Sequence, residues 1–554
     1  MSNVVEITDL RVSFATDAGA VNAVNGVSLT VAAGEALAIV GESGSGKSVT
    51  AKSILGLLPS TALSSGAVLL GATDVIAVDK KKLREIRGTD AAMVFQEPSL
   101  ALNPVYTVGW QIAEGLRAHG KFTKKQARAK AIEILDKVGI PAPEERVDYY
   151  PHQLSGGQKQ RVVIAMALVL EPGLIIADEP TTALDVTVQA EILDLLRRVR
   201  DEFGTAIVLI THNMGIVADL ADRVVVMLDG EIVEEAPVAQ LFANAQHPYT
   251  QKLLAAVPRI GTGAARAAQR KTERGGAVGE PIVVADNLVI EYPGRLGRKP
   301  FRAVDGVSFS IAPGEVLGLV GESGSGKTTI GRAIAGLTLV SGGSLKVLGT
   351  EVRGLGERAF RPLRADIGFV FQDPAASFNP RLTIAQAVAE PLIVNKRAGD
   401  AAGARKRVDE LLEAVQLPKT FGDRFPHELS GGQRQRASLA RSLALQPTLL
   451  IADEPTSALD VSVQARVLEL FAELQREFGF AALFISHDLA VVDMLADRIA
   501  VLYHGKLVEE GLGSEVLGSP QHPYTQRLLA SLPVPDPAEQ AQRRESLRLL
   551  RAAD

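Results

Sequence analysis

The sequence predicts an α/β protein in which one domain is repeated in tandem, and two observations support that prediction. The first is a duplication: GESGSGK starts at Gly41 and again at Gly321, and the strings LSGGQ and ADEPT recur at a constant offset of 275 residues. This offset is about half of the 554-residue chain, so the repeat is a whole domain. The second is an alternation of short apolar runs with helical segments, which is typical of a mostly parallel sheet.

Each predicted domain contains short buried strands that end at polar residues. The first strand of each copy leads into a Gly/Ser loop and a helix, and two later strands end before Asp-Glu-Pro and before a histidine. Because the carboxyl ends of parallel strands meet at one edge of a sheet, these polar residues are expected to gather there. The runs are Ala36–Val40, Leu174–Ala177 and Ile207–Ile210 in the first copy, and the start of Val316–Leu337, Leu449–Ala452 and Leu483–Ile485 in the second.

Composition along the chain predicts the domain boundaries. Residues 259–280 are rich in glycine, alanine and charge, which is typical of a flexible linker. The first domain is therefore expected over 1–258 and the second over 281–533. Residues 534–554 form a polar tail, whose last dozen residues could form a short amphipathic helix.

The overall composition excludes several classes of function. A net charge of −5 gives no broad basic surface, so no nucleic-acid partner is expected. The chain has no cysteine, which excludes disulfides, thiolate zinc sites and cysteine-bound iron–sulfur clusters. The longest apolar run, Val162–Leu170, is well short of the roughly 20 residues of a membrane span, and the first residues lack a signal-peptide pattern. We therefore expect a cytoplasmic chain that reaches the membrane through a partner.

The pattern GxxxxGK[ST] occurs in both copies and predicts two phosphate-binding loops. Its glycines let backbone N–H groups face phosphate oxygens, its lysine reaches the β- and γ-phosphates, and its hydroxyl can bind Mg²⁺. A glycine-rich turn without function is the alternative, but two copies in register argue against it. The candidate nucleotide-binding residues are Gly41, Ser43, Gly44, Ser45, Gly46, Lys47, Ser48 and Val49, and Gly321, Ser323, Gly324, Ser325, Gly326, Lys327, Thr328 and Thr329.

Two acidic residues follow a predicted strand in each copy. Asp178 and Asp453 could hold Mg²⁺, which prefers oxygen ligands, although a helix N-cap is the alternative role for such an aspartate. Glu179 and Glu454 come one residue later, where a carboxylate could act as a general base on a water near the γ-phosphate.

A histidine follows a further strand in each copy. His212 and His487 could hydrogen-bond the γ-phosphate and the attacking water. A lone histidine is usually structural, but the in-register duplication favours a functional role.

LSGGQ precedes a predicted helix in each copy and offers a second anion-binding surface. A serine and two glycines at a helix start combine a hydroxyl, free N–H groups and the positive end of the helix dipole. Because phosphate chemistry in one pocket needs one such surface, the second suggests that two domains close on each nucleotide. The residues are Ser155, Gly156, Gly157 and Gln158, and Ser430, Gly431, Gly432 and Gln433.

The combined strings GESGSGK[ST], FQ[ED]P, LSGGQ[KR]QR, ADEPT and ALD resemble the nucleotide-binding domain of ATP-binding cassette (ABC) proteins, over nearly the whole chain twice. The resemblance implies two tandem P-loop NTPase domains, each with a helical subdomain and a small antiparallel β region. It also implies an intramolecular sandwich that holds two ATP molecules with Mg²⁺, each between the phosphate loop of one half and LSGGQ of the other. Ser430 would thus complete the first site and Ser155 the second.

The same resemblance assigns roles to further residues. Gln96 and Gln372 would contact Mg²⁺ and water and couple the site to a partner, while Asp185 and Asp460 would communicate across the interface. The implied Mg²⁺ ligands are Ser48, Gln96 and Asp178 in the first site, and Thr328, Gln372 and Asp453 in the second.

ABC proteins stack adenine on an aromatic side chain upstream of the phosphate loop. Phe14 and Tyr292 are the candidates here, with Phe301 as a rival in the second half. One difference separates the halves, since Asn213 follows the first histidine and Asp488 the second. Both halves keep the glutamate and the histidine, so two competent sites are expected.

Longer strings resemble one branch of the family. FQEPSLALNP, FQDPAASFNP and the repeated QHPYTQ[KR]LLA are similar to the ATPase subunits of oligopeptide, dipeptide and nickel importers, fused here as in some bacterial peptide and glutathione importers. This implies two membrane permeases and an extracytoplasmic solute-binding protein as partners, at the cytoplasmic face of the inner membrane. The solute does not touch these domains, so the sequence does not identify it.

Other tandem-cassette proteins fit less well. Translation factors that act on ribosomes are the main alternative, but they resemble each other in a long basic connector, whereas this linker is short and mildly basic. Excision-repair ATPases need cysteine zinc modules, and chromosome-maintenance cassettes need a long coiled coil between the phosphate loop and LSGGQ. The sequence therefore favours an importer ATPase.

Overall fold

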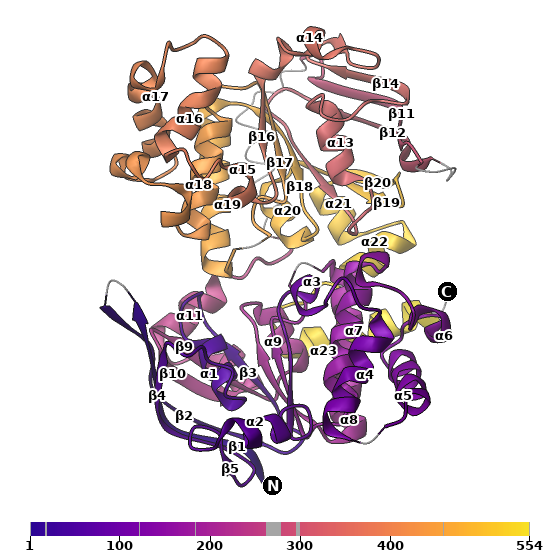
Figure 1. Ribbon diagram of the computed structural model, residues 1–554. Helices are drawn as coiled ribbons and strands as arrows, with labels where there is room; N and C mark the ends of the chain where they lie inside the picture. The colour runs from indigo at the N-terminus through magenta and orange to yellow at the C-terminus, as the bar shows by residue number, and fades with distance from the viewer. Residues whose placement is uncertain are drawn as a thin grey trace. The chain divides into compact units, whose positions relative to one another are not determined.

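The computed structural model describes residues 2–16, 19–120, 122–182, 184–261, 279–294, 300–457 and 459–552. The chain forms two compact units (Figure 1): unit 1 contains residues 1–257 and 533–554, and unit 2 contains residues 258–532. Most of the predicted linker, residues 262–278, lies outside the described residues. The α/β prediction with two tandem domains is confirmed, and each unit is described by itself below.

Unit 1 is built on two β-sheets. Its strands are β1 (Asn3–Thr16), β2 (Gly19–Ala32), β3 (Ala36–Val40), β4 (Ala62–Leu70), β5 (Thr73–Asp74), β6 (Ala91–Val94), β7 (Leu174–Asp178), β8 (Ala206–Ile210), β9 (Arg223–Leu228) and β10 (Glu231–Pro237). An antiparallel sheet has the order β2-β1-β4-β5. A six-stranded sheet has the order β10-β9-β3-β8-β7-β6, in which β10 is antiparallel to its neighbour and the others run parallel.

Helices cover the six-stranded sheet of unit 1 and form a separate helical region from α4, α5 and α7. The helices are α1 (Lys47–Ile54), α2 (Lys80–Ile86), α3 (Pro98–Ala101), α4 (Val108–His119), α5 (Lys124–Lys137), α6 (Pro143–Arg146), α7 (Gly156–Leu168), α8 (Val186–Phe203), α9 (Met214–Leu220), α10 (Val238–Asn244), α11 (Pro248–Ala255) and α23 (Pro537–Ala552).

Unit 2 repeats this arrangement. Its antiparallel sheet has the order β12-β11-β14-β15, and its six-stranded sheet the order β16-β17-β18-β13-β19-β20, with β20 antiparallel. The strands are β11 (Val283–Tyr292), β12 (Phe301–Ile311), β13 (Val316–Val320), β14 (Gly342–Val347), β15 (Thr350–Glu351), β16 (Ile367–Val370), β17 (Leu449–Asp453), β18 (Ala481–Ile485), β19 (Arg498–Tyr503) and β20 (Lys506–Leu512). The helices are α13 (Lys327–Ile334), α14 (Glu357–Phe360), α15 (Pro374–Ser377), α16 (Ile384–Val394), α17 (Ala401–Ala414), α18 (Gly431–Ser442), α19 (Val461–Phe478), α20 (Leu489–Leu495), α21 (Gly513–Gly518) and α22 (Pro523–Ala530).

Apart from charged residues at a few strand ends, the parallel strands are apolar, and β3 shows why. In β3, Leu37 and Ile39 pack into the core shared with the antiparallel sheet, whereas Ala38 and Val40 pack into the core under α9 and α10. Successive side chains of a strand point to opposite faces, so a strand covered on both sides reads as a continuous apolar run. Because the strands are buried along their length, the polar site residues lie at the carboxyl ends of the strands, along one edge of the sheet.

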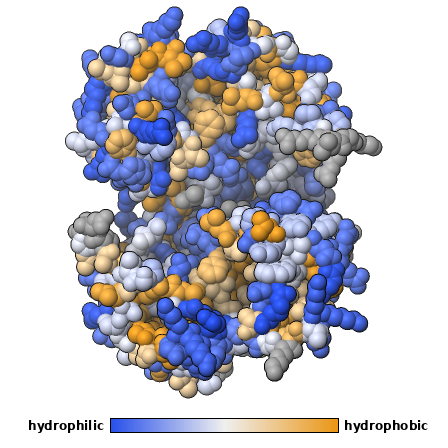
Figure 2. Space-filling view, viewed as in Figure 1, coloured by the Kyte–Doolittle hydropathy of each residue, from blue (hydrophilic) through white to orange (hydrophobic). Residues whose placement is uncertain are grey.

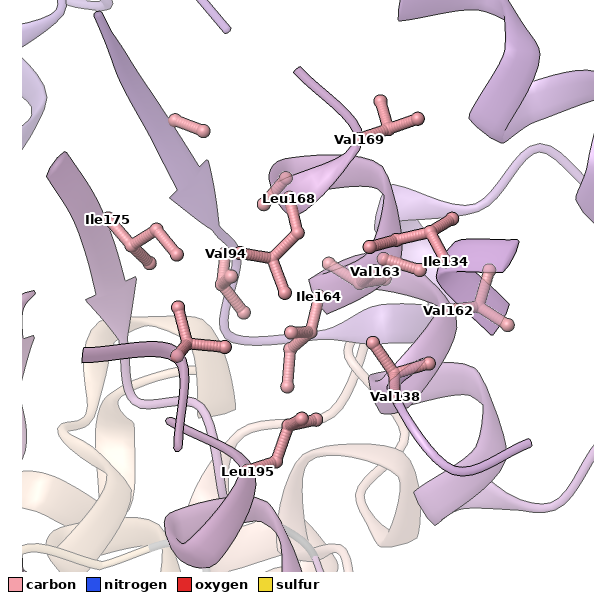
Figure 3. Close-up of a cluster of buried hydrophobic side chains, with 14 of the residues drawn as sticks. Val94, Ile134, Val138, Val162, Val163, Ile164, Leu168, Val169, Ile175 and Leu195 are labelled. Carbon is pink, nitrogen blue, oxygen red and sulfur yellow. The ribbon is translucent and has the colours of Figure 1, made fainter. Parts of the chain in front are cut away.

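The helical region shares a third core with the same sheet (Figure 3). Ile134 and Val138, from α5 and its end, converge on Ile164 and Leu168 of α7 and on Val94 of β6, and all five are buried. The helix that begins at LSGGQ is therefore anchored by apolar packing along its length.

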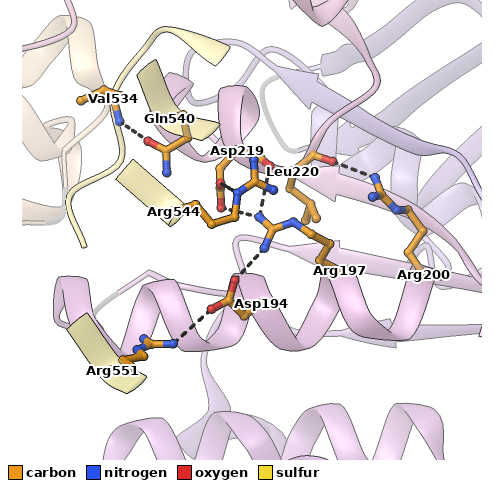
Figure 4. A network of polar contacts seen from close by, with 9 residues as sticks. All are labelled: Asp194, Arg197, Arg200, Asp219, Leu220, Val534, Gln540, Arg544 and Arg551. Atoms are coloured by element: carbon orange, nitrogen blue, oxygen red, sulfur yellow. Dashed lines mark hydrogen bonds and ion pairs between the residues drawn. The ribbon is translucent and has the colours of Figure 1, made fainter. Parts of the chain in front are cut away.

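The C-terminal helix α23 belongs to unit 1, a placement that the polar composition of the tail did not indicate. The helix packs on α9 and α10 and buries its own Leu547, and a group of ion pairs joins it to α8 and α9 (Figure 4). Arg197 of α8 donates to Asp219 of α9 at 2.8 Å, the Arg544 side chain lies 3.7 Å from the same carboxylate, and Arg551 donates to Asp194 at 3.2 Å.

Within the described part of the chain, every helix is too short or too polar to cross a bilayer. On the face shown in Figure 2, hydrophilic residues dominate and apolar ones occur in separate groups.

Candidate functional site

The predicted phosphate loop follows β3 in unit 1 and β13 in unit 2, and in both units its lysine donates to two equivalent carbonyl oxygens. Lys47 Nζ donates to the carbonyl oxygens of Gly41 and Glu42 at 2.8 and 2.7 Å. Lys327 Nζ donates to those of Gly321 and Glu322, both at 2.7 Å. Each lysine is the first residue of the helix that follows the loop, and its ammonium group reaches back to the first residues of the loop.

The first and last glycines of each loop are required by close backbone approach. A Cβ at Gly41 would lie 2.2 Å from the carbonyl oxygen of Met227, and one at Gly46 would lie 2.5 Å from that of Ala23. Both residues also have positive φ, at 150° and 96°, where other residues are strained. Gly321 and Gly326 show the same contacts, at 2.1 and 2.5 Å.

A hydroxyl and a carboxylate meet beneath each loop. Ser48 Oγ donates to Asp178 Oδ1 at 3.0 Å, and Thr328 Oγ1 donates to Asp453 Oδ1 at 2.9 Å. Burial raises the pKa of both aspartates, against the opposing effect of the hydroxyl hydrogen bond and the nearby cationic side chains.

This pair fits a site for Mg²⁺. Among the described residues no group of three or more His, Asp or Glu side chains could enclose a metal ion by itself. One carboxylate and one hydroxyl suit Mg²⁺, which usually keeps several waters and takes its other ligands from phosphate oxygens. The predicted N-cap alternative for these aspartates finds no support, since both are the last residues of β7 and β17.

The next glutamate in each unit is the centre of a polar cluster. Glu179 accepts hydrogen bonds from Gln96 Nε2 at 2.6 Å and from Thr182 Oγ1 at 2.9 Å, and its Oε1 lies 3.0 Å from Nδ1 of His212. In unit 2, Glu454 accepts from Gln372 Nε2 at 2.9 Å and lies 3.3 Å from His487 Nδ1. The structure therefore brings together, within each unit, the glutamate, glutamine and histidine that the sequence singled out.

Both glutamates are held in an unusual backbone conformation. Glu179 and Glu454 have φ values of 48° and 47°, a left-handed conformation that costs energy for a residue with a side chain. Burial alone would raise the pKa of each carboxyl, but the hydrogen bond and charge of the neighbouring histidine, together with the other hydrogen bonds and the charge of the loop lysine, hold the pKa below its ordinary value. The cluster keeps a carboxylate, rather than a carboxylic acid, at each strand end.

The difference between Asn213 and Asp488 leaves the local backbone unchanged. Asn213 Oδ1 accepts from the N–H groups of Gly215 and Ile216, and Asp488 Oδ1 accepts from the two equivalent N–H groups in unit 2. Both residues are therefore N-caps. Burial lowers the pKa of His487, but its hydrogen bond to Glu454 and the charges of Glu454 and Asp488 raise it overall.

The two LSGGQ segments start helices α7 and α18 through capping boxes. Ser155 accepts from the N–H of Gln158 at 3.3 Å, and the Gln158 side chain accepts from the N–H of Ser155 at 3.1 Å; Ser430 and Gln433 repeat the exchange. Ser155, Gly156 and Ser430 are exposed. Their pairing with the phosphate loop of the other unit stays a prediction.

The candidate adenine-stacking residues differ in their surroundings. Phe14 packs against the core of the antiparallel sheet, partly buried. Tyr292 is 38% exposed, and its hydroxyl lies 3.4 Å from Thr329 Oγ1, at the start of the helix after the phosphate loop. Phe301, the rival, pairs with Tyr292 across β11 and β12 and is 63% exposed. Tyr292 is therefore beside its loop, and the stacking role stays a prediction.

Sequence reasoning missed three residues of these sites. Thr182 bonds the glutamate of unit 1, and it could have been suspected from its place directly after ADEPT. Tyr249 and Tyr524 accept hydrogen bonds from the phosphate loops at 2.9 and 3.0 Å, more than 200 residues away in sequence. The sequence signal for these two tyrosines is the repeated QHPYT, because a string that recurs in both halves indicates a shared structural role.

Comparison with known families agrees with this geometry. A family model described as ABC transporter matches residues 24–182 and 304–457. The chain therefore belongs to the ABC transporter family, as an ATP-binding and ATP-hydrolysing protein. A second model, described as oligopeptide/dipeptide transporter, C-terminal region, matches residues 233–279 and 508–552. Both halves therefore contain the C-terminal region of oligopeptide and dipeptide transporters.

Curated relatives are similar over nearly their whole length. The glutathione import ATP-binding protein GsiA of Pectobacterium atrosepticum is 47% identical over 97% of this chain and 90% of the relative. GsiA of Salmonella choleraesuis is 46% identical and that of Escherichia coli 45%, each over 98% of this chain and 91% of the relative. These relatives favour the importer over the ribosome-acting alternative.

A solved dimeric structure of a bacterial ABC transporter cassette is also similar. It is 32% identical, covers 42% of this chain and 98% of its own, and has a TM-score of 0.39.

Proposed function

We propose that this chain powers the uptake of a peptide or a related small solute such as glutathione through two membrane permeases. The single observation that carries the proposal is that each unit joins a phosphate loop, a hydroxyl–carboxylate pair and a glutamate–glutamine–histidine cluster at one sheet edge. The importer role follows the names of the relatives and the oligopeptide/dipeptide C-terminal region in both halves.

Each ATP is proposed to be closed by both units. The phosphate loop of one unit holds the β- and γ-phosphates, and the exposed start of the LSGGQ helix of the other unit covers them with its hydroxyl and N–H groups. Ser430 to Gln433 would thus serve the first site, and Ser155 to Gln158 the second. Asp185, which caps α8 by accepting from the N–H of Val188, and Asp460 would sit near that contact.

The residues of each site have separate roles in ATP hydrolysis. Ser48 with Asp178, and Thr328 with Asp453, would hold Mg²⁺, which neutralises phosphate charge when bound. Glu179 and Glu454 accept a proton from the attacking water, a task for which their lowered pKa keeps them ionised. His212 and His487 orient the carboxylate and reach toward the γ-phosphate, while Gln96 and Gln372 position water and sense the nucleotide.

The permeases are proposed to dock beside Gln96 and Gln372. In unit 1 this region carries exposed apolar side chains, among them Phe95, Tyr106 and Trp110, which are 43%, 41% and 40% exposed. The Tyr106 and Trp110 rings stack with centroids 4.0 Å apart. Exposed apolar groups of this kind mark contact surfaces. Closure on ATP and release after hydrolysis would then drive the permeases, and the chain would lie at the cytoplasmic face of the inner membrane.

Co-purification tests the proposal. The tagged full chain, extracted from its host in mild detergent, is expected to bring down two hydrophobic membrane proteins. Addition of a periplasmic fraction containing the solute-binding protein should then raise ATP turnover. Recovery of ribosomal subunits in place of membrane proteins would contradict it. The ligand that co-purifies with the solute-binding protein identifies the solute.

A further inference from the structure

The repeated QHPYT segment starts a short helix in each unit, α11 and α22, and is built in the same way in both. His247 Nδ1 accepts from the N–H of Tyr249 at 3.2 Å, and His522 Nδ1 accepts from that of Tyr524 at 3.1 Å. Each histidine is therefore the N-cap, followed by proline at the first helical position, where its missing N–H is not needed.

A glutamate of the neighbouring edge strand holds the start of the segment. Glu234 of β10 accepts from the N–H groups of Gln246 and His247, at 2.7 and 3.0 Å. Glu509 of β20 accepts from those of Gln521 and His522, at 2.8 and 3.1 Å. The segment is thus tied to the same sheet that carries the phosphate loop, which limits its freedom to move relative to that loop.

The tyrosine hydroxyl of each segment reaches the phosphate loop. Glu42 N donates to Tyr249 Oη at 2.9 Å, and Glu322 N donates to Tyr524 Oη at 3.0 Å. The carbonyl oxygen of the same loop residue accepts from the lysine, Lys47 or Lys327, at 2.7 Å in each unit. The backbone N–H of one loop residue is therefore bonded to the tyrosine, and its backbone carbonyl to the lysine.

The rings are held firmly enough to set the position of the hydroxyl. Tyr524 is 2% exposed, and its ring stacks on Tyr503 with centroids 4.0 Å apart. Tyr249 is half-buried and packs against the core under α9 and α10. A rigid phenol that accepts from the N–H of Glu42 or Glu322 restricts the rotation of the peptide that joins this residue to the preceding glycine. It therefore also restricts the orientation of the Gly41 or Gly321 carbonyl, which accepts from the lysine as well.

We propose that Tyr249 and Tyr524 are positioning residues for nucleotide binding, and that the C-terminal extension of each half acts through them. Each hydroxyl fixes the residue after the first loop glycine, so that the lysine and the following N–H groups are arranged for the β- and γ-phosphates before ATP arrives. The inference rests on ATP binding at the loops and is independent of what the protein imports.

Replacement of the hydroxyl alone tests the proposal. The double variant Tyr249→Phe/Tyr524→Phe keeps both rings and their packing. Tyr503→Phe is the matched control, because it removes a hydroxyl from the ring that stacks on Tyr524. The purified full chain is compared by calorimetric titration with ATP and Mg²⁺, by thermal unfolding without nucleotide, and by hydrogen exchange of the peptides that cover the two loops.

The double variant is expected to bind ATP about fivefold more weakly, as the loss of one ordinary hydrogen bond per site implies. Exchange of the loop peptides should become faster, the unfolding midpoint should stay within about 2 °C of that of the parent chain, and Tyr503→Phe should match the parent chain in ATP affinity.

Unchanged affinity in the double variant would overturn the proposal, and so would an equal loss in Tyr503→Phe. Loss of affinity that appears only together with a lowered unfolding midpoint would also overturn it, since the tyrosines would then be merely structural. None of these measurements needs permeases, so failure of the importer assignment would leave their result unaffected.

Discussion

Glu179 and Glu454 are partly buried carboxylates in a left-handed backbone conformation, each beside a histidine. If they are the general bases, replacement by glutamine keeps the shape of the side chain and removes its ability to take a proton. The two single variants are expected to lose comparable shares of ATP turnover, and the double variant about 10²-fold or more. Steady-state phosphate release from the purified chain measures this.

Unequal single variants would contradict the symmetric account. If Glu179→Gln abolished turnover and Glu454→Gln left it untouched, or the reverse, one site would be hydrolytically idle. Binding of ATP by each variant is the control, because loss of affinity would place the glutamate in binding rather than in proton transfer.

The carboxylate of Glu509 makes the attachment of the QHPYT segment in unit 2 dependent on pH. Burial raises its pKa, but the hydrogen bonds from the backbone N–H groups of Gln521 and His522 lower it overall. A lowered pKa means that its contribution to stability is present above the pKa of the unfolded chain, about 4.3, and is lost as pH falls through the folded value.

Glu509→Gln is therefore expected to weaken the protection of the Gln521 and His522 amides by about 1–2 kcal/mol at pH 7. The deficit should stay constant from pH 7 down to about 4.3 and shrink only below that value, as the folded-state carboxylate is protonated and comes to resemble glutamine. Native-state hydrogen exchange at pH 7 and at several values below about 4.3 measures it. A deficit that does not change with pH would show that the ionised carboxylate is not what holds the segment.

The two glycines at the start of the LSGGQ helix α7 have different surroundings. A Cβ at Gly157 would lie 2.5 Å from Val188 Cγ1 of helix α8, whereas one at Gly156 would meet only Leu184, at 3.9 Å. Packing within unit 1 thus explains why Gly157 is glycine. It does not explain Gly156, whose lack of a side chain we relate to the proposed contact with nucleotide.

Two alanine variants separate these reasons. Gly157→Ala is expected to lower the free energy of unfolding of unit 1 by about 1–3 kcal/mol through overpacking. Gly156→Ala should leave stability unchanged, or raise it by up to about 1 kcal/mol, and yet reduce ATP turnover. Denaturant unfolding and phosphate release report the two effects. Full turnover in Gly156→Ala would count against contact between this glycine and nucleotide.

Helix α23 offers a matched pair of leucines. Leu547 is 6% exposed and Leu549 is 62% exposed. Leu547→Ala is expected to weaken the docking of α23 on unit 1 by about 2–4 kcal/mol and to speed hydrogen exchange over residues 537–552, because it removes buried apolar contacts. Leu549→Ala should leave exchange unchanged. Equal behaviour of the two variants would mean that the helix does not pack as described.

The sequence could predict those parts of the site that depend on local pattern. Strand ends followed by GxxxxGK[ST], Asp-Glu and histidine were enough to locate Lys47, Asp178 and His212 at one edge, because parallel strands bring their carboxyl ends together. The hydrogen bond between Tyr249 and the loop could not be foreseen, since it joins segments 207 residues apart. The docking of α23 was equally hidden, because amphipathic periodicity shows that a face is apolar without showing what it packs against.

For the whole molecule, the duplication has one main consequence: each unit holds a phosphate loop, and each holds an LSGGQ helix whose start is exposed. A single unit places these two features on different elements, and they serve one nucleotide if the units combine head to tail. Fusion in one chain raises the local concentration of each unit for the other. We therefore expect a two-site sandwich.

A cryo-EM map of the Glu179→Gln/Glu454→Gln chain with ATP and Mg²⁺ tests whether this sandwich forms. We predict two nucleotides, with Ser430 Oγ within hydrogen-bond distance of the triphosphate bound by Lys47 and Ser155 Oγ equally close to the one bound by Lys327. Two occupied phosphate loops with both serines facing solvent would contradict it.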